Sequence, residues 1–251
     1  MSAIVGRKLG MTRVFDDDGL ATPVTVIEAA PNVITAIRRG DRDGYEAIQL
    51  AGDPVAERKL TKAELGHLKK ANAGAMRTLA EFRDLELPSQ EEADAPAAAG
   101  DEGDSPDPGA GGEDASPDRG GGAEDASSDG EAGERKVGDT VTVADFEPGQ
   151  KVKVSAVSVG KGFQGTIRRH NFSRGPVSHG SHNVRAPGSA GASADPARIF
   201  PGQKMPGQMG SRRVTQRGAT VVEVDAERNL LLIKGSVPGS KNATVEVRSV
   251  G

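Results

Sequence analysis

The chain has 251 residues and no cysteine, which excludes disulfides, thiolate metal sites and cysteine nucleophiles and fits a reducing cytoplasm. Only 35% of its residues are hydrophobic and 3% are aromatic, so we expect one modest β-rich core with polar excursions instead of a single large core. The formal net charge is −4, but residues 86–134 hold sixteen acidic residues and one arginine. Without that segment the chain carries +11, and the distribution of charge, not its sum, indicates the partners.

No part of the sequence resembles a targeting or membrane segment. The N-terminal stretch lacks the long apolar run of a signal peptide, and no stretch approaches the ~18 apolar residues of a membrane span. The sequence therefore predicts a soluble, cytoplasmic protein without a membrane partner.

The first third of the chain reads as short strands joined by turns. Residues 23–29 alternate apolar and polar side chains, the pattern of a half-buried strand. Thr61 and Glu64 have the spacing of a capping box, which predicts a helix over about 62–71, and residues 78–85 suit a further strand. We therefore assign residues 1–85 to the first half of an antiparallel β-barrel with a helical excursion.

Residues 86–134 form an acidic, low-complexity insertion. Asp, Glu, Gly, Ala, Ser and Pro dominate it, and such a composition does not bury enough apolar surface to offset chain entropy. The sequence predicts a disordered insertion. Its role is open between a solubilising spacer and a nucleic-acid mimic that shields basic residues elsewhere in the chain. The barrel is expected to resume with strands in residues 135–159 and to close with strands in residues 219–251.

The stretch between those last two groups of strands, residues 160–218, is strongly basic. It carries ten Lys and Arg residues against the single acid Asp195, a formal charge of +9. Gly, Pro and Ser interrupt it throughout, and neither helical nor strand periodicity runs through it. Phe163 and Phe172 are unusual for a disordered loop. The alternatives are a flexible basic loop without a fixed partner and a finger that folded RNA orders through phosphates and unstacked bases.

Three other interpretations of this stretch fit poorly. Residues 160–165 match G-x-G-x-x-G, but the following residues are poor helix formers and no acidic residue stands ~20 positions on to bind a ribose. His170, His179 and His182 lack the further ligands that a closed zinc site needs. No nucleophile motif is present, and a basic loop with one acid suits acid–base catalysis poorly. We expect no enzyme activity, cofactor, metal or small-molecule substrate.

Several motifs together resemble the bacterial large-subunit ribosomal protein L3 family. They are GRKLGMTRVF at 6–15, PVTVIEA at 23–29, DGYEAIQL at 43–50, GKGFQGTIRRHNF at 160–172, PGSAGA at 187–192, KMPGQMG at 204–210 and DAERNLLLIKGSVPG at 225–239. The resemblance covers nearly the whole chain apart from residues 86–134. It implies a β-barrel of the translation-factor type with a long basic finger.

The same resemblance implies a function. It indicates a structural component of the large ribosomal subunit that binds 23S rRNA directly, nucleates assembly, contacts neighbouring ribosomal proteins and extends the finger toward the peptidyl transferase centre. The candidate rRNA-binding residues are Arg7, Lys8, Arg13, Lys161, Arg168, Arg169, His170, Arg174, His179, His182, Arg185, Arg198, Lys204, Arg212, Arg213 and Arg217. The competing hypotheses are a free regulatory nucleic-acid-binding protein and an enzyme that binds a nucleotide at the glycine motif.

Overall fold

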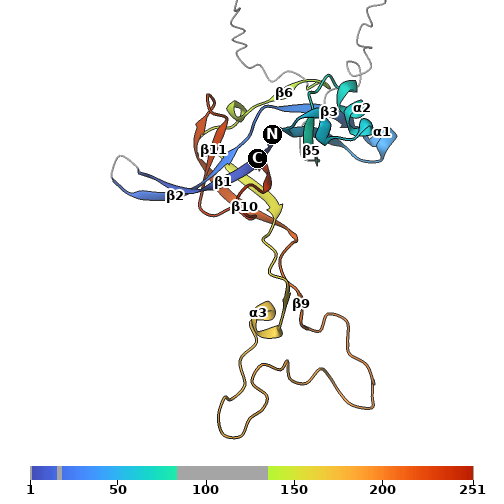
Figure 1. The fold of residues 1–251 in the computed structure, drawn as a ribbon, viewed down its shortest axis with the longest axis vertical. Coiled ribbons are helices and arrows are strands. Elements are labelled where there is room, and N and C mark those ends of the chain that lie inside the picture. The colour runs from blue at the N-terminus through green and yellow to red at the C-terminus, as the bar shows by residue number, and fades with distance from the viewer. Residues whose placement is uncertain (1, 16–18, 84–134, 251) are drawn as a thin grey trace, which may run out of the picture.

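A computed structural model describes residues 2–15, 19–83 and 135–250 (Figure 1). Its main body is a closed antiparallel barrel, in which the strands are hydrogen-bonded in the order β1-β12-β7-β10-β11-β2. These strands are β1 (Ala3–Phe15), β2 (Ala21–Glu28), β7 (Lys151–Val157), β10 (Arg213–Asp225), β11 (Leu230–Lys234) and β12 (Thr244–Ser249). The predicted mainly β fold with a barrel is confirmed.

The barrel forms because its strands alternate buried and exposed side chains. In β7, Val152 and Val154 are fully buried, while Lys151 points to solvent. Ile27 and Leu231 come from neighbouring strands and join the same buried cluster. Each fully buried aliphatic side chain contributes about 1.5–3 kcal/mol relative to an exposed one, so this cluster holds the barrel closed.

A second sheet stands beside the barrel, in the order β5-β4-β3-β6. Its strands are β3 (Asn32–Arg38), β4 (Ala47–Pro54), β5 (Met76–Phe82) and β6 (Thr140–Val141). It has its own core, which includes Ile34, Ile48, Leu50 and Phe82. Residues 1–85 therefore supply only β1 and β2 to the barrel, and β6 also lies outside it, which corrects the assignment of 1–85 and 135–159 to the barrel alone. An alternating pattern identifies a strand but does not name its partner, and this is why the sequence merged the two sheets.

Short helices connect these strands: α1 (Gly40–Asp43), η1 (Glu57–Lys59), α2 (Lys62–Lys70), η2 (Val143–Asp145) and α3 (Thr166–His170). The capping box at the start of α2 is confirmed. The Glu64 carboxylate accepts a hydrogen bond of 2.8 Å from the Thr61 N–H, and the Thr61 hydroxyl oxygen accepts one of 3.3 Å from the Glu64 N–H. Among the described residues, no helix is long and apolar enough to cross a membrane.

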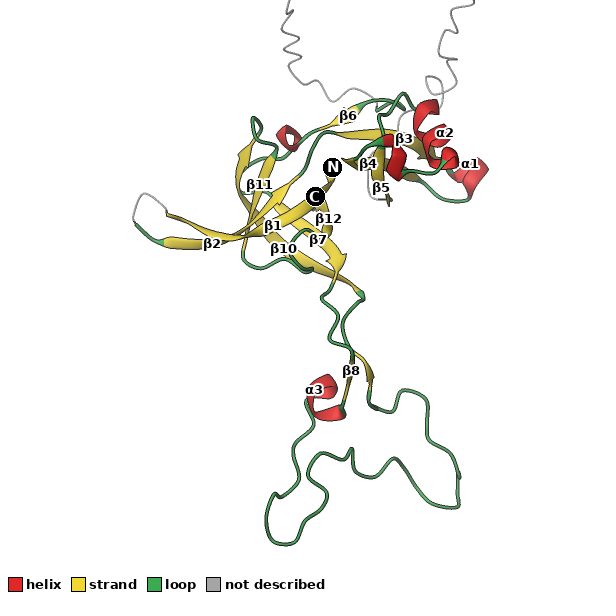
Figure 2. Ribbon diagram, in the orientation of Figure 1, coloured by secondary structure: helices red, strands yellow, loops and turns green. Residues whose placement is uncertain are grey.

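The finger leaves one end of the barrel between β7 and β10, away from the second sheet (Figure 1). It first runs as two close limbs that include β8 (Phe163–Gln164) and β9 (Gly207–Gln208), and then opens into a wide loop (Figure 2). Residues 213–218 were predicted to lie in the finger, but they belong to β10, in which Arg213 pairs with Val157 of β7. Gly218 and the arginines of this segment are typical of a loop, so the sequence pattern did not indicate a strand. The pairing with β7 continues on both sides of a bulge between Gln216 and Ala219. The predicted insertion 86–134 lies outside the described residues.

Candidate nucleic-acid interface

The finger has almost no core of its own. Of residues 160–212, only Thr166 is buried, and residues 171–206 contain no helix or strand. Large apolar side chains stand in solvent, with Phe163 exposed by 76% and Val177 by 69%. A segment this long with one buried side chain does not owe its shape to internal packing.

The base of the finger, residues 158–170 and 205–212, is different, and we call it the neck. Its two limbs are joined by backbone hydrogen bonds, among them Lys161 N–H to the Met209 carbonyl at 2.9 Å and Met209 N–H to the Gly162 carbonyl at 3.0 Å. The β8–β9 pairing continues this ladder. The neck therefore carries the loop on a protein-made support.

Two side chains of α3 lock the neck. Arg169 donates a 2.6 Å hydrogen bond through Nη1 to the Met205 carbonyl of the other limb, and His170 Nε2 donates to the same oxygen at 3.0 Å. Gly207 makes this possible, because a Cβ there would lie only 2.8 Å from Arg169 Nη1. The carbonyl that accepts from Arg169 belongs to Met205 of the KMPGQMG motif. We identified this motif in the sequence but did not predict that it pairs with α3.

The helix α3 corrects the expectation that the residues after the glycine motif are not helical. It is a single turn, and it ends at Asn171, which adopts a left-handed conformation with φ of 58°. Asn tolerates this conformation better than most residues, and the bonds to the Met205 carbonyl hold the turn in place. The glycines of the motif serve the neck as well, since a Cβ on Gly160 would collide with the Ser211 side chain.

Two adjacent pairs of arginines among the candidate rRNA-binding residues, 168–169 and 212–213, are divided by the structure. Arg168 and Arg212 are exposed and have no side-chain hydrogen bond or ion pair within the described residues. Arg169 spans the neck, and Arg213 forms a two-pronged ion pair with Glu246 of β12. One member of each pair thus supports the protein, and the other is available to a ligand.

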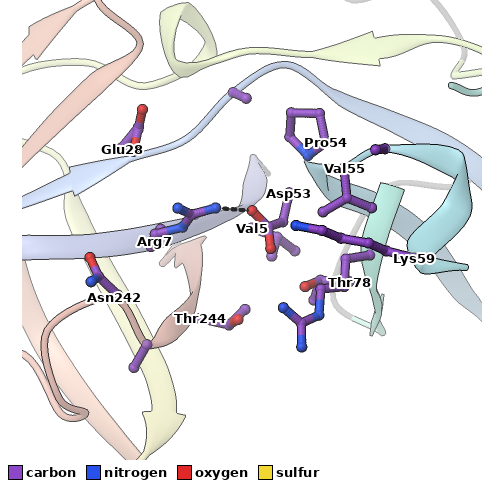
Figure 3. Close-up of a pocket in the computed structure, with 15 residues that line it drawn as sticks. Val5, Arg7, Glu28, Asp53, Pro54, Val55, Lys59, Thr78, Asn242 and Thr244 are labelled. Carbon is purple, nitrogen blue, oxygen red and sulfur yellow. Dashed lines mark hydrogen bonds and ion pairs between the residues drawn. The ribbon is translucent and has the colours of Figure 1, made fainter. Parts of the chain in front are cut away.

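The three candidates in β1 lie outside the finger and already have contacts. Arg7 forms an ion pair with Asp53 across the cleft between the barrel and the second sheet (Figure 3). The Lys8 ammonium donates hydrogen bonds to the carbonyls of Val237 at 2.7 Å and Gly239 at 3.1 Å. The guanidinium of Arg13 lies 5.7 Å from the centre of the Phe15 ring. The first two residues therefore brace the barrel.

The remaining candidates all lie along the finger and its junction with β10. They are exposed, and none has a side-chain hydrogen bond or ion pair with another described residue: Lys161, Arg174, His179, His182, Arg185, Arg198, Lys204 and Arg217. Arg198 lies 5.8 Å from the Phe200 ring centre, and the rings of His170 and Phe172 are 6.2 Å apart. Unneutralised cations beside exposed rings are the groups that bind RNA phosphates and stack on bases. In the described ranges, no three His, Asp or Glu residues gather as metal ligands would.

The fold and this surface together define a class of protein: a small β-barrel with an attached sheet and a long basic finger. A family model described as ribosomal protein L3 matches residues 126–229. Curated proteins named large ribosomal subunit protein uL3 match nearly all of the chain. The one from Synechococcus sp. (strain CC9605) is 40% identical over 98% of this chain and 92% of its own length. The one from Trichlorobacter lovleyi is 41% identical over 98% of this chain and 95% of its own length.

The chain therefore belongs to the ribosomal protein L3 family, whose members are structural proteins of the large ribosomal subunit and not enzymes.

Proposed function

We propose that the protein binds 23S rRNA directly through its finger, nucleates assembly of the large subunit and extends the finger loop toward the peptidyl transferase centre. One observation carries the proposal: a finger that buries only Thr166 displays exposed cations that have no side-chain hydrogen bond or ion pair within the described part of the chain. Folded RNA supplies the phosphates and the unstacked bases that such a surface lacks.

The neck fixes the direction in which the finger leaves the barrel. Because the neck is hydrogen-bonded on both limbs and continues β7 and β10, the direction of the loop is set by the barrel. Arg168 and Arg212 project from the neck and are the residues best placed to grip phosphates where the finger enters RNA. Arg binds phosphate with two parallel hydrogen bonds, so these contacts orient the finger without reading sequence. The finger's destination rests on the family resemblance alone.

The binding test uses the full chain and a purified 23S rRNA fragment titrated at several salt concentrations. If the finger neutralises six to eight phosphates, log K falls against log[salt] with a slope of roughly −4 to −7, at about 0.7–0.9 per phosphate. A slope near zero would refute direct binding through the finger.

A matched variant isolates the loop. Replacing residues 171–204 by a short Gly-Ser linker keeps the barrel and the neck, and we expect it to lower the affinity and flatten the slope. Sedimentation of the full chain with the large subunit after a high-salt wash separates a ribosomal component from a free regulatory protein, since only the former remains bound.

A further inference from the structure

A second projection leaves the barrel, and its chemistry is unlike that of the finger. We call it the arm. It consists of residues 10–15 of β1, residue 20 and the first three residues of β2, 21–23. Backbone bonds from Lys8 N–H to the Ala243 carbonyl and from Asn242 N–H to the Lys8 carbonyl are the last to join β1 to the strand beside it. From there to Phe15, β1 pairs only with β2, and Figure 1 shows the ribbon leaving the barrel wall. At ~3.4 Å per residue the free part of β1 is about 20 Å long.

The arm has a free backbone edge. Within the described residues, β1 from Gly10 to Phe15 has a strand partner on one side only. A two-stranded ribbon in water is marginally stable by itself, and an unpaired edge is a template for another strand. The arm is therefore built like an element that a partner completes.

One face of the arm is apolar. Met11 is exposed by 53% and Phe15 by 62%, and strand alternation places both on the same face. Leu20, exposed by 68%, precedes Ala21, the residue that pairs with Phe15. The register puts Pro23 opposite Arg13 on this face, and Pro23 is exposed as well. Elsewhere on the barrel the large apolar side chains point mostly inward, so this row of exposed ones marks an interaction site.

The charge of the arm argues against RNA as the partner. Its only cation is Arg13, whose guanidinium rests on the Phe15 ring, and the sequence joining its two strands contains Asp16, Asp17 and Asp18. Three acids repel phosphate, whereas the finger, residues 160–212, has eight basic residues against one acid. A protein surface with an apolar centre, flanking basic side chains and an extended segment fits this arm, because that segment can pair with the free edge of β1.

We propose that the arm is a protein-docking element that binds an extended, basic segment of a neighbouring ribosomal protein, while the finger binds RNA. The inference rests on the proposed function, because it places the partner in the assembled large subunit. The partner's strand adds to β1, and its apolar side chains cover Met11, Phe15 and Leu20.

The test places a photoreactive residue at each projection. Full-length chains with Phe15→p-benzoylphenylalanine or Val177→p-benzoylphenylalanine are assembled into large subunits from purified rRNA and subunit proteins, and are then irradiated. Both positions are exposed to a similar degree, so Val177 in the finger loop is the matched control. We expect an RNase-resistant adduct with one ribosomal protein from position 15 and an RNA adduct from position 177.

A second variant tests the energetics. The triple variant Met11→Ser, Phe15→Ser, Leu20→Ser should bind naked rRNA within twofold of the wild type and bind the cross-linked protein at least tenfold more weakly. Its melting temperature checks that the barrel remains folded.

The two proposals fail in different ways. An RNA adduct, an adduct with a second copy of this chain or no adduct at position 15 overturns the docking role, as does a more than twofold loss of naked-rRNA affinity in a folded triple variant. Absence of an RNA adduct at position 177 overturns rRNA binding by the loop. The adduct at position 15 then still decides whether the arm binds a protein. Failure of the wild-type chain to enter the subunit refutes both.

Discussion

The barrel and the finger, which is inserted in it between β7 and β10, differ in what holds them in shape. The barrel buries fifteen side chains in one apolar cluster, including Ile4 and Val247 from its first and last strands. The finger, 160–212, buries one side chain, and most of its cations have no side-chain hydrogen bond or ion pair with another residue that the structure describes. The barrel is thus determined by its own core, whereas the finger has a hydrogen-bonded base and a loop without a core of its own.

Breaking the barrel core should have the largest effect. Leu231 is fully buried in the barrel cluster, and Leu231→Ala should reduce the free energy of unfolding by about 2–5 kcal/mol because it leaves a cavity. Urea denaturation followed by circular dichroism measures this. The matched change Ile199→Ala, at a half-exposed site in the finger, should stay within about 0.5 kcal/mol. Similar losses at both sites would contradict the contrast between the two regions.

A substitution in the neck should reduce the stability of the neck alone. Arg169→Ala removes the 2.6 Å hydrogen bond to the Met205 carbonyl and should weaken the neck by about 1 kcal/mol without changing the barrel. Hydrogen exchange at the Lys161 and Met209 amides, which bond across the limbs, reports the change directly. Arg168→Ala, one residue away on the same helix and exposed, is the control and should leave both amides as protected as before.

The division of the arginine pairs should appear in RNA binding. The double variant Arg168→Ala, Arg212→Ala should lower the steepness of the salt dependence by about 1.4–1.8, the contribution of two phosphates. Arg7→Ala removes a cation that is paired with Asp53 and should leave the slope unchanged. Equal changes in slope would show that the pairing of a cation in the free protein does not predict its role on RNA.

No effect on RNA binding is expected at α2, which lies with the second sheet and away from the finger (Figure 2). Hydrogen bonds from the Thr61 backbone N–H and, secondarily, the Thr61 hydroxyl lower the pKa of Glu64. Its contribution to stability is therefore present above the ordinary glutamate pKa of about 4.3 and is lost as the pH falls through the lower folded pKa.

Removing the cap tests this helix. Thr61→Ala should cost about 0.5–2 kcal/mol at neutral pH, and it should reduce but not abolish the acid-dependent loss attributed to Glu64, because the backbone N–H of residue 61 still donates to the carboxylate. Thermal melting between pH 7 and pH 3 measures both effects, and Thr78→Ala in β5 serves as a control without a cap. A change in rRNA affinity in the Thr61 variant would show that the second sheet and the finger are coupled.

The sequence by itself determined the local features of this protein. The alternation of Val152 and Val154 indicated a strand, and the spacing of Thr61 and Glu64 indicated the start of a helix, because both signals lie within a few residues. The charge of the finger needed no structure either. The tertiary structure alone decided which strands share a sheet, because a strand's pattern gives its buried face and not its partner. It also decided which arginines are available, since Arg169 and Arg213 find partners 36 and 33 residues away that adjacent Arg168 and Arg212 do not reach.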